Sequence, residues 1–187
     1  MPQNKNPPKT TSEEEKVYLL KIKEYLATTG LPVEIAENES GAAIIMPLAP
    51  TGPTAEAPLM IQIKKQVVAN LDLESGQESP TMISAIFMVH LPFTVKASAL
   101  ADTVLLMNFI NSTFPVTGFD VEMGELKPKF KYTLLNSVDH IDKTVILSVV
   151  GIIMYAMDLF LTHIRNVAEG KSKFQDTIQQ LIPPQEG

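Results

Sequence analysis

The sequence predicts an α+β fold, in which helices pack on one face of an antiparallel sheet. Helical apolar spacing occurs near the start, in the middle and near the end of the chain, and stretches of period-two alternation lie between. The strands are grouped and do not alternate singly with helices, which favours an antiparallel sheet. With 187 residues, 45% of them hydrophobic, we expect one domain at residues 12–170. A disordered tail is expected at residues 1–11, and a short C-terminal helix and tail at residues 171–187.

The domain begins with a predicted helix at residues 12–29. Ser12 and Glu15 have the spacing of a capping box, in which each side chain accepts a hydrogen bond from the backbone N–H of the other residue. The three glutamates at residues 13–15 suit the positive end of the helix dipole, and Gly30 follows as a stop signal.

Strand patterns fill the region between the first and second helices. Residues 31–48 alternate on both sides of a Ser40-Gly41 turn, which predicts a hairpin. Residues 47–58 contain four prolines and are predicted to be an exposed loop. From residue 59 to residue 74 the alternation predicts one long strand, or two collinear strands, with one polar face.

The next strand, MISAIFMVHLPF at residues 82–93, has apolar residues on both of its faces. Such a strand is expected to be covered on both sides. If the helices cover one face, self-association or a bound polypeptide has to cover the other. We therefore predict a partner-binding surface on this strand, formed by Ile83, Ile86, Phe87, Met88, Val89 and Leu91.

A second helix is predicted at residues 96–113, because Leu100, Val104, Met107 and Ile110 share one helical face. A second hairpin follows it. Its first strand carries two acidic residues and its second strand carries alternating lysines, so acid–base pairs are expected across the hairpin.

The third helix is predicted at about residues 141–167, with Asp139 as its N-cap and Gly170 at its end. Its run TVILSVVGIIMYAM has 14 residues without a charge before Asp158. A membrane-spanning helix needs about 20 apolar residues, so we predict a core helix and no membrane insertion. The apolar residues surround nearly the whole first half of the helix, which indicates a second contact.

Composition limits the partners that the chain can have. The net charge is −6 and the basic residues do not cluster, so nucleic acid is not an expected partner. The absence of cysteine excludes disulfides and thiolate nucleophiles and fits a reducing compartment. The N-terminal residues lack the apolar region of a secretory signal, so a cytoplasmic protein is expected.

No residue pattern predicts catalysis. His90, His140 and His163 lie in different predicted elements without ligand spacing, so no metal site is expected. Nucleotide-binding loops and a nucleophile elbow are missing from the sequence, and we expect no catalytic residue and no cofactor. These features favour a binding protein. The alternative is a small-molecule-binding or enzymatic domain with its pocket between the sheet and the third helix.

Three stretches carry a resemblance to a known family: LADTVLLMNFINSTFPVTGF with Asn108 and Asn111, FDVEMGELKPKFKYTLL, and DHIDKTVILSVV. Together with the element order, over about residues 12–170, they resemble the YbjN family, whose fold is similar to that of type III secretion chaperones. The resemblance implies the order α-β-β-β-α-β-β-α and a small acidic protein, which we expect to be a non-enzymatic homodimer that binds polypeptides. Secretion chaperones hold extended client segments along apolar patches of their sheet, a mode related to peptide-binding grooves.

Overall fold

The computed structural model of the protein describes residues 11–38, 41–49, 52–67, 81–137 and 141–182. This part of the chain forms a six-stranded antiparallel sheet and four α-helices, which confirms the predicted α+β class. The helices are α1 (Glu13–Ala27), α2 (Leu100–Thr113), α3 (Lys143–Ala168) and α4 (Phe174–Leu181), with two short 3-10 turns, η1 (Pro53–Glu56) and η2 (Ala97–Ala99). The strands are β1 (Glu34–Asn38), β2 (Gly41–Met46), β3 (Leu59–Val67), β4 (Thr81–His90), β5 (Phe119–Glu122) and β6 (Lys127–Ser137).

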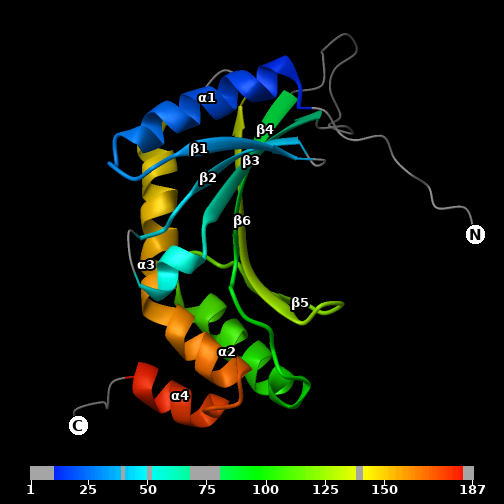
Figure 1. The fold of residues 1–187 in the computed structure, drawn as a ribbon, viewed down its shortest axis with the longest axis vertical. Coiled ribbons are helices and arrows are strands. Elements are labelled where there is room, and N and C mark those ends of the chain that lie inside the picture. Colours follow the sequence, from blue (N-terminus) through cyan, green and yellow to red (C-terminus); the bar gives the residue numbers. More distant parts are fainter. Residues whose placement is uncertain (1–10, 39–40, 50–51, 68–80, 138–140, 183–187) are drawn as a thin grey trace, which may run out of the picture.

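The strand order in the sheet is β1-β2-β3-β4-β6-β5, and every neighbouring pair is antiparallel. The segment containing α2 and β5 lies between β4 and β6 in the sequence, yet β4 and β6 are hydrogen-bonded neighbours. Four strands precede α2, one more than in the order that the family resemblance implies. In Figure 1, α1 crosses one end of the sheet, α3 runs along one side, and α2 and α4 lie at the other end.

The sheet has one face against the helices, which we call the inner face. Its central side chains are at most 1% exposed: Leu59, Ile61 and Ile63 of β3, and Ile83, Ala85, Phe87 and Val89 of β4. They form a single apolar cluster with the buried side chains of three helices, among them Leu19 and Ile22 of α1, Ile110 of α2, and Ile146, Ile153 and Met157 of α3. Full burial of one such side chain stabilises the fold by about 1.5–3 kcal/mol.

The start of α1 is tied to the sheet through its cap. The predicted capping box is present: Ser12 Oγ accepts from the Glu15 N–H at 3.2 Å, and Glu15 Oε2 accepts from the Ser12 N–H at 2.8 Å. The other oxygen, Glu15 Oε1, accepts from the backbone N–H of Lys65 on β3 at 2.9 Å. Burial opposes ionisation of this carboxyl, but these hydrogen bonds and the nearby Lys64 charge outweigh it and lower its pKa.

The third helix follows its prediction except at its cap. The N-cap of α3 is Asp142, whose carboxylate accepts from the backbone N–H groups of Thr144 and Val145; the predicted cap, Asp139, lies outside the described residues. Gly170 ends the helix with φ of 71°, in the left-handed region that glycine favours. By length and composition α3 is apolar enough to cross a membrane, but in this structure its inner side forms part of the core.

The proline-bearing segment at residues 47–58 differs from the predicted exposed loop. Leu48 is 2% exposed and Ala57 is 0% exposed, so both ends of the segment pack into the core. Between them η1 lies against α3, and Glu56 reaches Arg165 of that helix at 3.7 Å. The strand predicted at residues 59–74 is confirmed as far as Val67, and its remainder lies outside the described residues.

Asn111 joins α2 to the start of β5. Its Oδ1 accepts from the backbone N–H groups of Gly118 and Phe119, both at 3.1 Å, and its Nδ2 donates to the Phe119 carbonyl at 2.9 Å. Phe119 in turn packs edge-to-face on Phe130 of β6, with ring centroids 5.1 Å apart. The amide of Asn111 thus has a structural role, because it holds α2 at the start of β5.

Replacing Asn111 with alanine is expected to lower the free energy of unfolding by about 1–3 kcal/mol, because it leaves two backbone donors and one acceptor without their partners. Asn108 is exposed on the same helix, so Asn108→Ala serves as a matched control with an effect within about 0.5 kcal/mol. Urea denaturation followed by circular dichroism measures both. Equal losses in the two variants would contradict this role of Asn111.

Replacing Glu15 with glutamine is expected to destabilise the protein at neutral pH by about 1 kcal/mol, because an amide has one acceptor oxygen where the carboxylate uses two. The folded-state pKa of Glu15 is lowered, so its carboxylate contributes stability above its ordinary value of 4.5 and loses that contribution as the pH falls. The difference between wild type and Glu15→Gln should therefore shrink in urea denaturation below that pH. A difference that stays constant down to acid pH would exclude the carboxylate as its source.

Candidate functional site

The six residues predicted to bind a partner are divided between the two faces of the sheet. Ile83, Phe87 and Val89 are 0% exposed and belong to the inner face, and Leu91, just after β4, is 4% exposed. A partner of the folded chain cannot contact these side chains, so the prediction is corrected for them: they are core residues. Ile86 and Met88 point the other way and are half-buried, at the centre of the opposite face.

We call that opposite side the outer face. The strand register places Ile45 of β2 beside Met60 of β3, and Met60 beside Met88 of β4. The same row ends at Glu34 on β1 and at Lys131 on β6. Directly opposed side chains in antiparallel strands have Cβ atoms about 4.5–5.5 Å apart. An apolar row, with an acid at one end and a base at the other, therefore crosses five strands of the sheet.

A second and a third row lie beside the first. In the second row, Ile86 stands between Gln62 of β3 and Thr133 of β6. In the third row, Ser84 is paired with Leu135, which is 54% exposed. Ser84 itself is 0% exposed, and its Oγ has no hydrogen-bond partner within the described part of the chain. The outer face thus combines exposed apolar side chains with a buried, unsatisfied hydroxyl.

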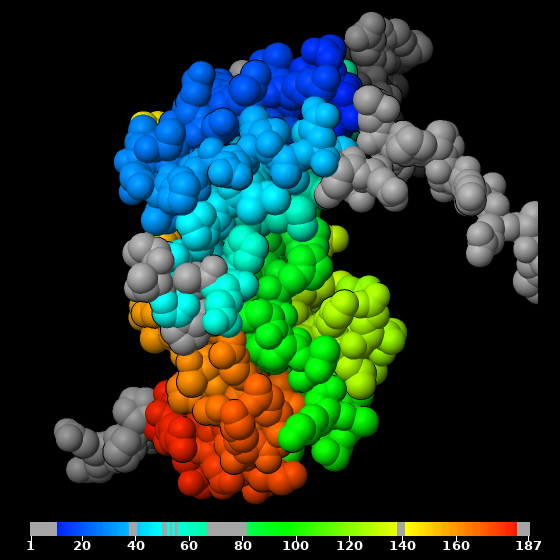
Figure 2. Space-filling model, viewed as in Figure 1, coloured from blue at the N-terminus to red at the C-terminus, as the bar shows by residue number. Residues whose placement is uncertain are grey.

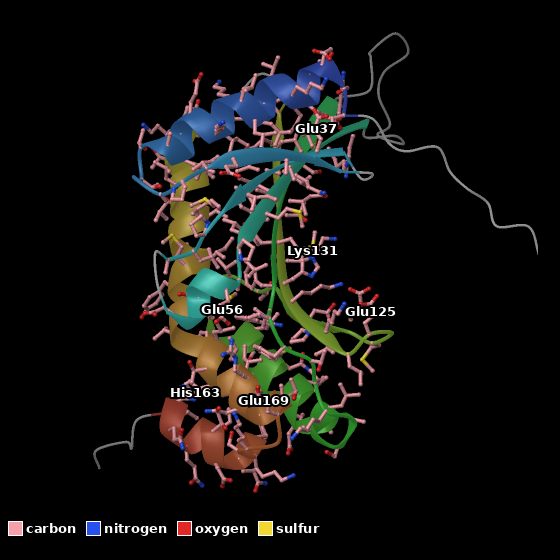
Figure 3. The ribbon with its side chains drawn as sticks, viewed as in Figure 1. Glu37, Glu56, Glu125, Lys131, His163 and Glu169 are labelled. Atoms are coloured by element: carbon pink, nitrogen blue, oxygen red, sulfur yellow. The ribbon has the colours of Figure 1, made fainter. Side chains whose placement is uncertain are left out.

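Charged residues border the apolar rows toward the β5–β6 hairpin. Figure 3 shows Lys131 on the side of the sheet that faces away from α3. Lys129 forms an ion pair with Glu122 across the hairpin at 3.4 Å, in agreement with the predicted acid–base pairing. At the turn, the hydrogen bond and the charge of Glu125 raise the pKa of Lys127, and the same contact lowers the pKa of Glu125. In Figure 2 the hairpin projects from the body of the molecule beside the sheet.

The alternative site, a pocket between the sheet and α3, coincides with a fully buried part of the core. Ile146, Ile153 and Met157 of α3 are 0% exposed against the inner face. A hollow of about 280 Å³ lies instead at the surface, between η1 and α3, where Met154, Tyr155 and Asp158 line it. The described residues contain no group of three or more side chains that could hold a metal ion. His90 and His163 lie on separate elements, β4 and α3, and His140 lies outside the described residues.

Ile45, Met60 and Leu135 were not among the predicted partner-binding residues. The signal for Ile45 was its parity, since Ile44 and Met46 on either side of it face the core. For Leu135 the signal was the Leu134-Leu135 pair, which places one leucine on each face of β6. In both cases alternation assigns the residue to one face of its strand, but it does not show which face the helices cover.

Comparison with known proteins found no match to this chain among protein-family models, curated proteins or solved structures.

The two faces of β4 are expected to respond differently to truncation. Phe87→Ala should lower the free energy of unfolding by about 3–5 kcal/mol, because it opens a cavity at a fully buried position. Ile86→Ala, its neighbour on the half-buried outer face, should cost about 1 kcal/mol or less. Urea denaturation measures both. Similar losses for the two variants would mean that the outer face is packed as tightly as the core.

Proposed function

We propose that this protein is a non-enzymatic protein-binding module that holds a polypeptide segment on its outer face. The observation that carries the proposal is the apolar row of Ile45, Met60 and Met88, which stays accessible after the helices have covered the inner face. Ile45 is 36% exposed, and a contiguous apolar surface of this kind is typical of an interaction site.

The composition of the outer face favours a partner with varied sequence. Met60, Met82 and Met88 all lie on this face, and methionine adapts its unbranched, polarizable side chain to differently shaped neighbours. An extended segment presents every second side chain to the surface on which it lies. Apolar residues at alternate positions of the partner would fill the spaces between the methionines.

Charge adds a preference to this apolar contact. Lys131 is exposed at one end of the row, and Glu34 is exposed at the other. A segment that crosses the row with an acidic residue near Lys131 and a basic residue near Glu34 complements both ends. Such charges at the border of an interface contribute more to orientation than to affinity.

The proposal adopts the binding mode of the proteins that the sequence resembles. Type III secretion chaperones, to which the YbjN fold is similar, hold client segments along apolar sheet patches. In this chain the corresponding patch is the outer face, formed by β2, β3, β4 and β6. The apolar rows of this face, and not a catalytic group, support the proposal.

The test is binding to an array of random 12-residue peptides by the wild type and by the double variant Ile86→Asp/Met88→Asp. Wild type should retain peptides with alternating apolar residues, and the double variant should bind them at least about tenfold more weakly, because each carboxylate adds a desolvation cost at the interface. Leu105→Asp, at a position 49% exposed on α2, is the matched control and should bind as wild type does.

Backbone amide NMR shifts on adding a retained peptide should change in β3, β4 and β6. Urea denaturation of the double variant separates lost binding from lost folding. If the wild type retains no peptide, or if the folded double variant binds as well as the control, the outer face is not a polypeptide-binding surface.

A further inference from the structure

The side of α3 that faces away from the sheet is a second exposed apolar surface. In an apolar stretch of 18 residues within this helix, only 39% of the residues are buried. Val145 is 40% exposed, Tyr155 58% and Leu159 40%, and Ser148, Gly151 and Asp158 are exposed along the same side. In chain order, the first five of these residues recur every three or four positions, and Leu159 lies four positions after Tyr155, so the six form one stripe along the helix, which we call the α3 stripe.

Gly151 lies at the middle of the α3 stripe. Glycine weakens a helix interior relative to alanine. Apart from its chain neighbours and the backbone of its own helix, a Cβ atom added at Gly151 would meet no atom within 4 Å in the described structure. Packing within that part of the chain does not explain the glycine. A missing side chain on an exposed helix surface does allow another helix to approach closely, since the distance between helix axes depends on the side chains at the crossing point.

We propose that two copies of this chain associate through the α3 stripe, with the two helices antiparallel and crossing near Gly151. A two-fold axis next to residue 153 would place Gly151 against Tyr155 of the second copy, so that a large side chain meets a gap. It would also place Val145 near the other Leu159, and the Ser148 hydroxyl near the other Asp158 carboxylate, to which it can donate. The stripe is thus complementary to itself, as a two-fold symmetric interface requires.

Charge complementarity selects the antiparallel arrangement and a second copy as the occupant. Lys143 is exposed at the start of α3, and Asp158 is exposed about four turns later. In the antiparallel arrangement each Lys143 lies five residues, about 7.5 Å along the helix, from the position opposite Asp158 of the other copy, and its long side chain can extend toward that carboxylate. Parallel helices would place the two Asp158 carboxylates side by side. A lipid bilayer would offer the Asp158 carboxylate no partner.

The α3 stripe is a different surface from the proposed polypeptide-binding site. The α3 helix packs on the inner face, and the outer face lies on the opposite side of the sheet (Figure 1). A dimer formed through the α3 stripe therefore leaves both outer faces open. The two proposals can succeed or fail independently.

The first test is the mass of the protein by light scattering over a dilution series. Wild type should have twice the chain mass of 20.5 kDa, and Tyr155→Asp should have the mass of a single chain. Leu105→Asp, which places the same charge at an exposed site on α2, is the control and should remain dimeric. A wild type that is monomeric at every concentration would overturn the inference.

The second test uses the absence of cysteine in the chain. Val145→Cys and Leu159→Cys are made as separate variants, mixed, and oxidised with copper phenanthroline. The mixture should form a disulfide-linked dimer in much higher yield than either variant alone, because only the antiparallel register brings position 145 near position 159. Equal yields in the mixture and in the separate samples would overturn the register. This test does not depend on whether Tyr155→Asp folds.

The third test exchanges the charges. Lys143→Asp and Asp158→Lys should each weaken dimerisation about fivefold or more, since each places like charges together, and the double variant should recover most of the wild-type affinity. If instead Ile86→Asp/Met88→Asp dissociates the dimer and Tyr155→Asp does not, the copies associate through the outer face and the α3 stripe is not the interface. Binding of monomeric wild type to phospholipid vesicles, lost in Tyr155→Asp, would equally overturn the inference.

Discussion

Packing of α3 against the inner face of the sheet is the interaction on which the other parts of this structure depend. The helix contributes Ile146, Ile153 and Met157 to the apolar cluster, all at 0% exposure, opposite the fully buried side chains of β3 and β4. The other helices take their positions around this contact. The cap of α1 binds β3 through Glu15, and Asn111 holds α2 against the start of β5.

One consequence of this packing is that the two faces of the sheet have different environments. A helix layer covers one face of a sheet at a time, and in the described part of the chain α1, α2 and α3 share one apolar cluster with the inner-face side chains of β3 and β4. The apolar row of the outer face remains accessible after the helices have buried the inner face. Because that row does not contribute to the closed core, its sequence can be selected for contact with another polypeptide.

A similar division applies to α3 itself. The inner side of the helix is buried, while Tyr155 and Leu159 remain exposed on its outer side. The core requires apolar residues only on the inner side of α3. The run of 14 uncharged residues also places apolar residues on the outer side, which the core leaves uncovered. The chain therefore has two apolar surfaces on opposite sides of one core, one on the sheet and one on the helix.

The sequence by itself determined the local features of this protein. The capping box of Ser12 and Glu15, the strand alternation and the acid–lysine hairpin depend on residues close together in the chain, or on a periodicity that one element sets alone. The α+β class followed from the order of these elements, and the long third helix followed from its apolar spacing.

Only the tertiary structure decided which face of β4 is covered and which residues remain available. Ile86 and Phe87 are both large and apolar, and alternation assigns them to opposite faces without ranking the faces. The choice depends on where α3 packs, a contact between residues about sixty positions apart. The same reason applies to the burial of Leu48 and Ala57 within a proline-bearing segment, and to the open space beside Gly151 in the described structure. Packing between distant segments sets both features, and no local sequence pattern predicts them.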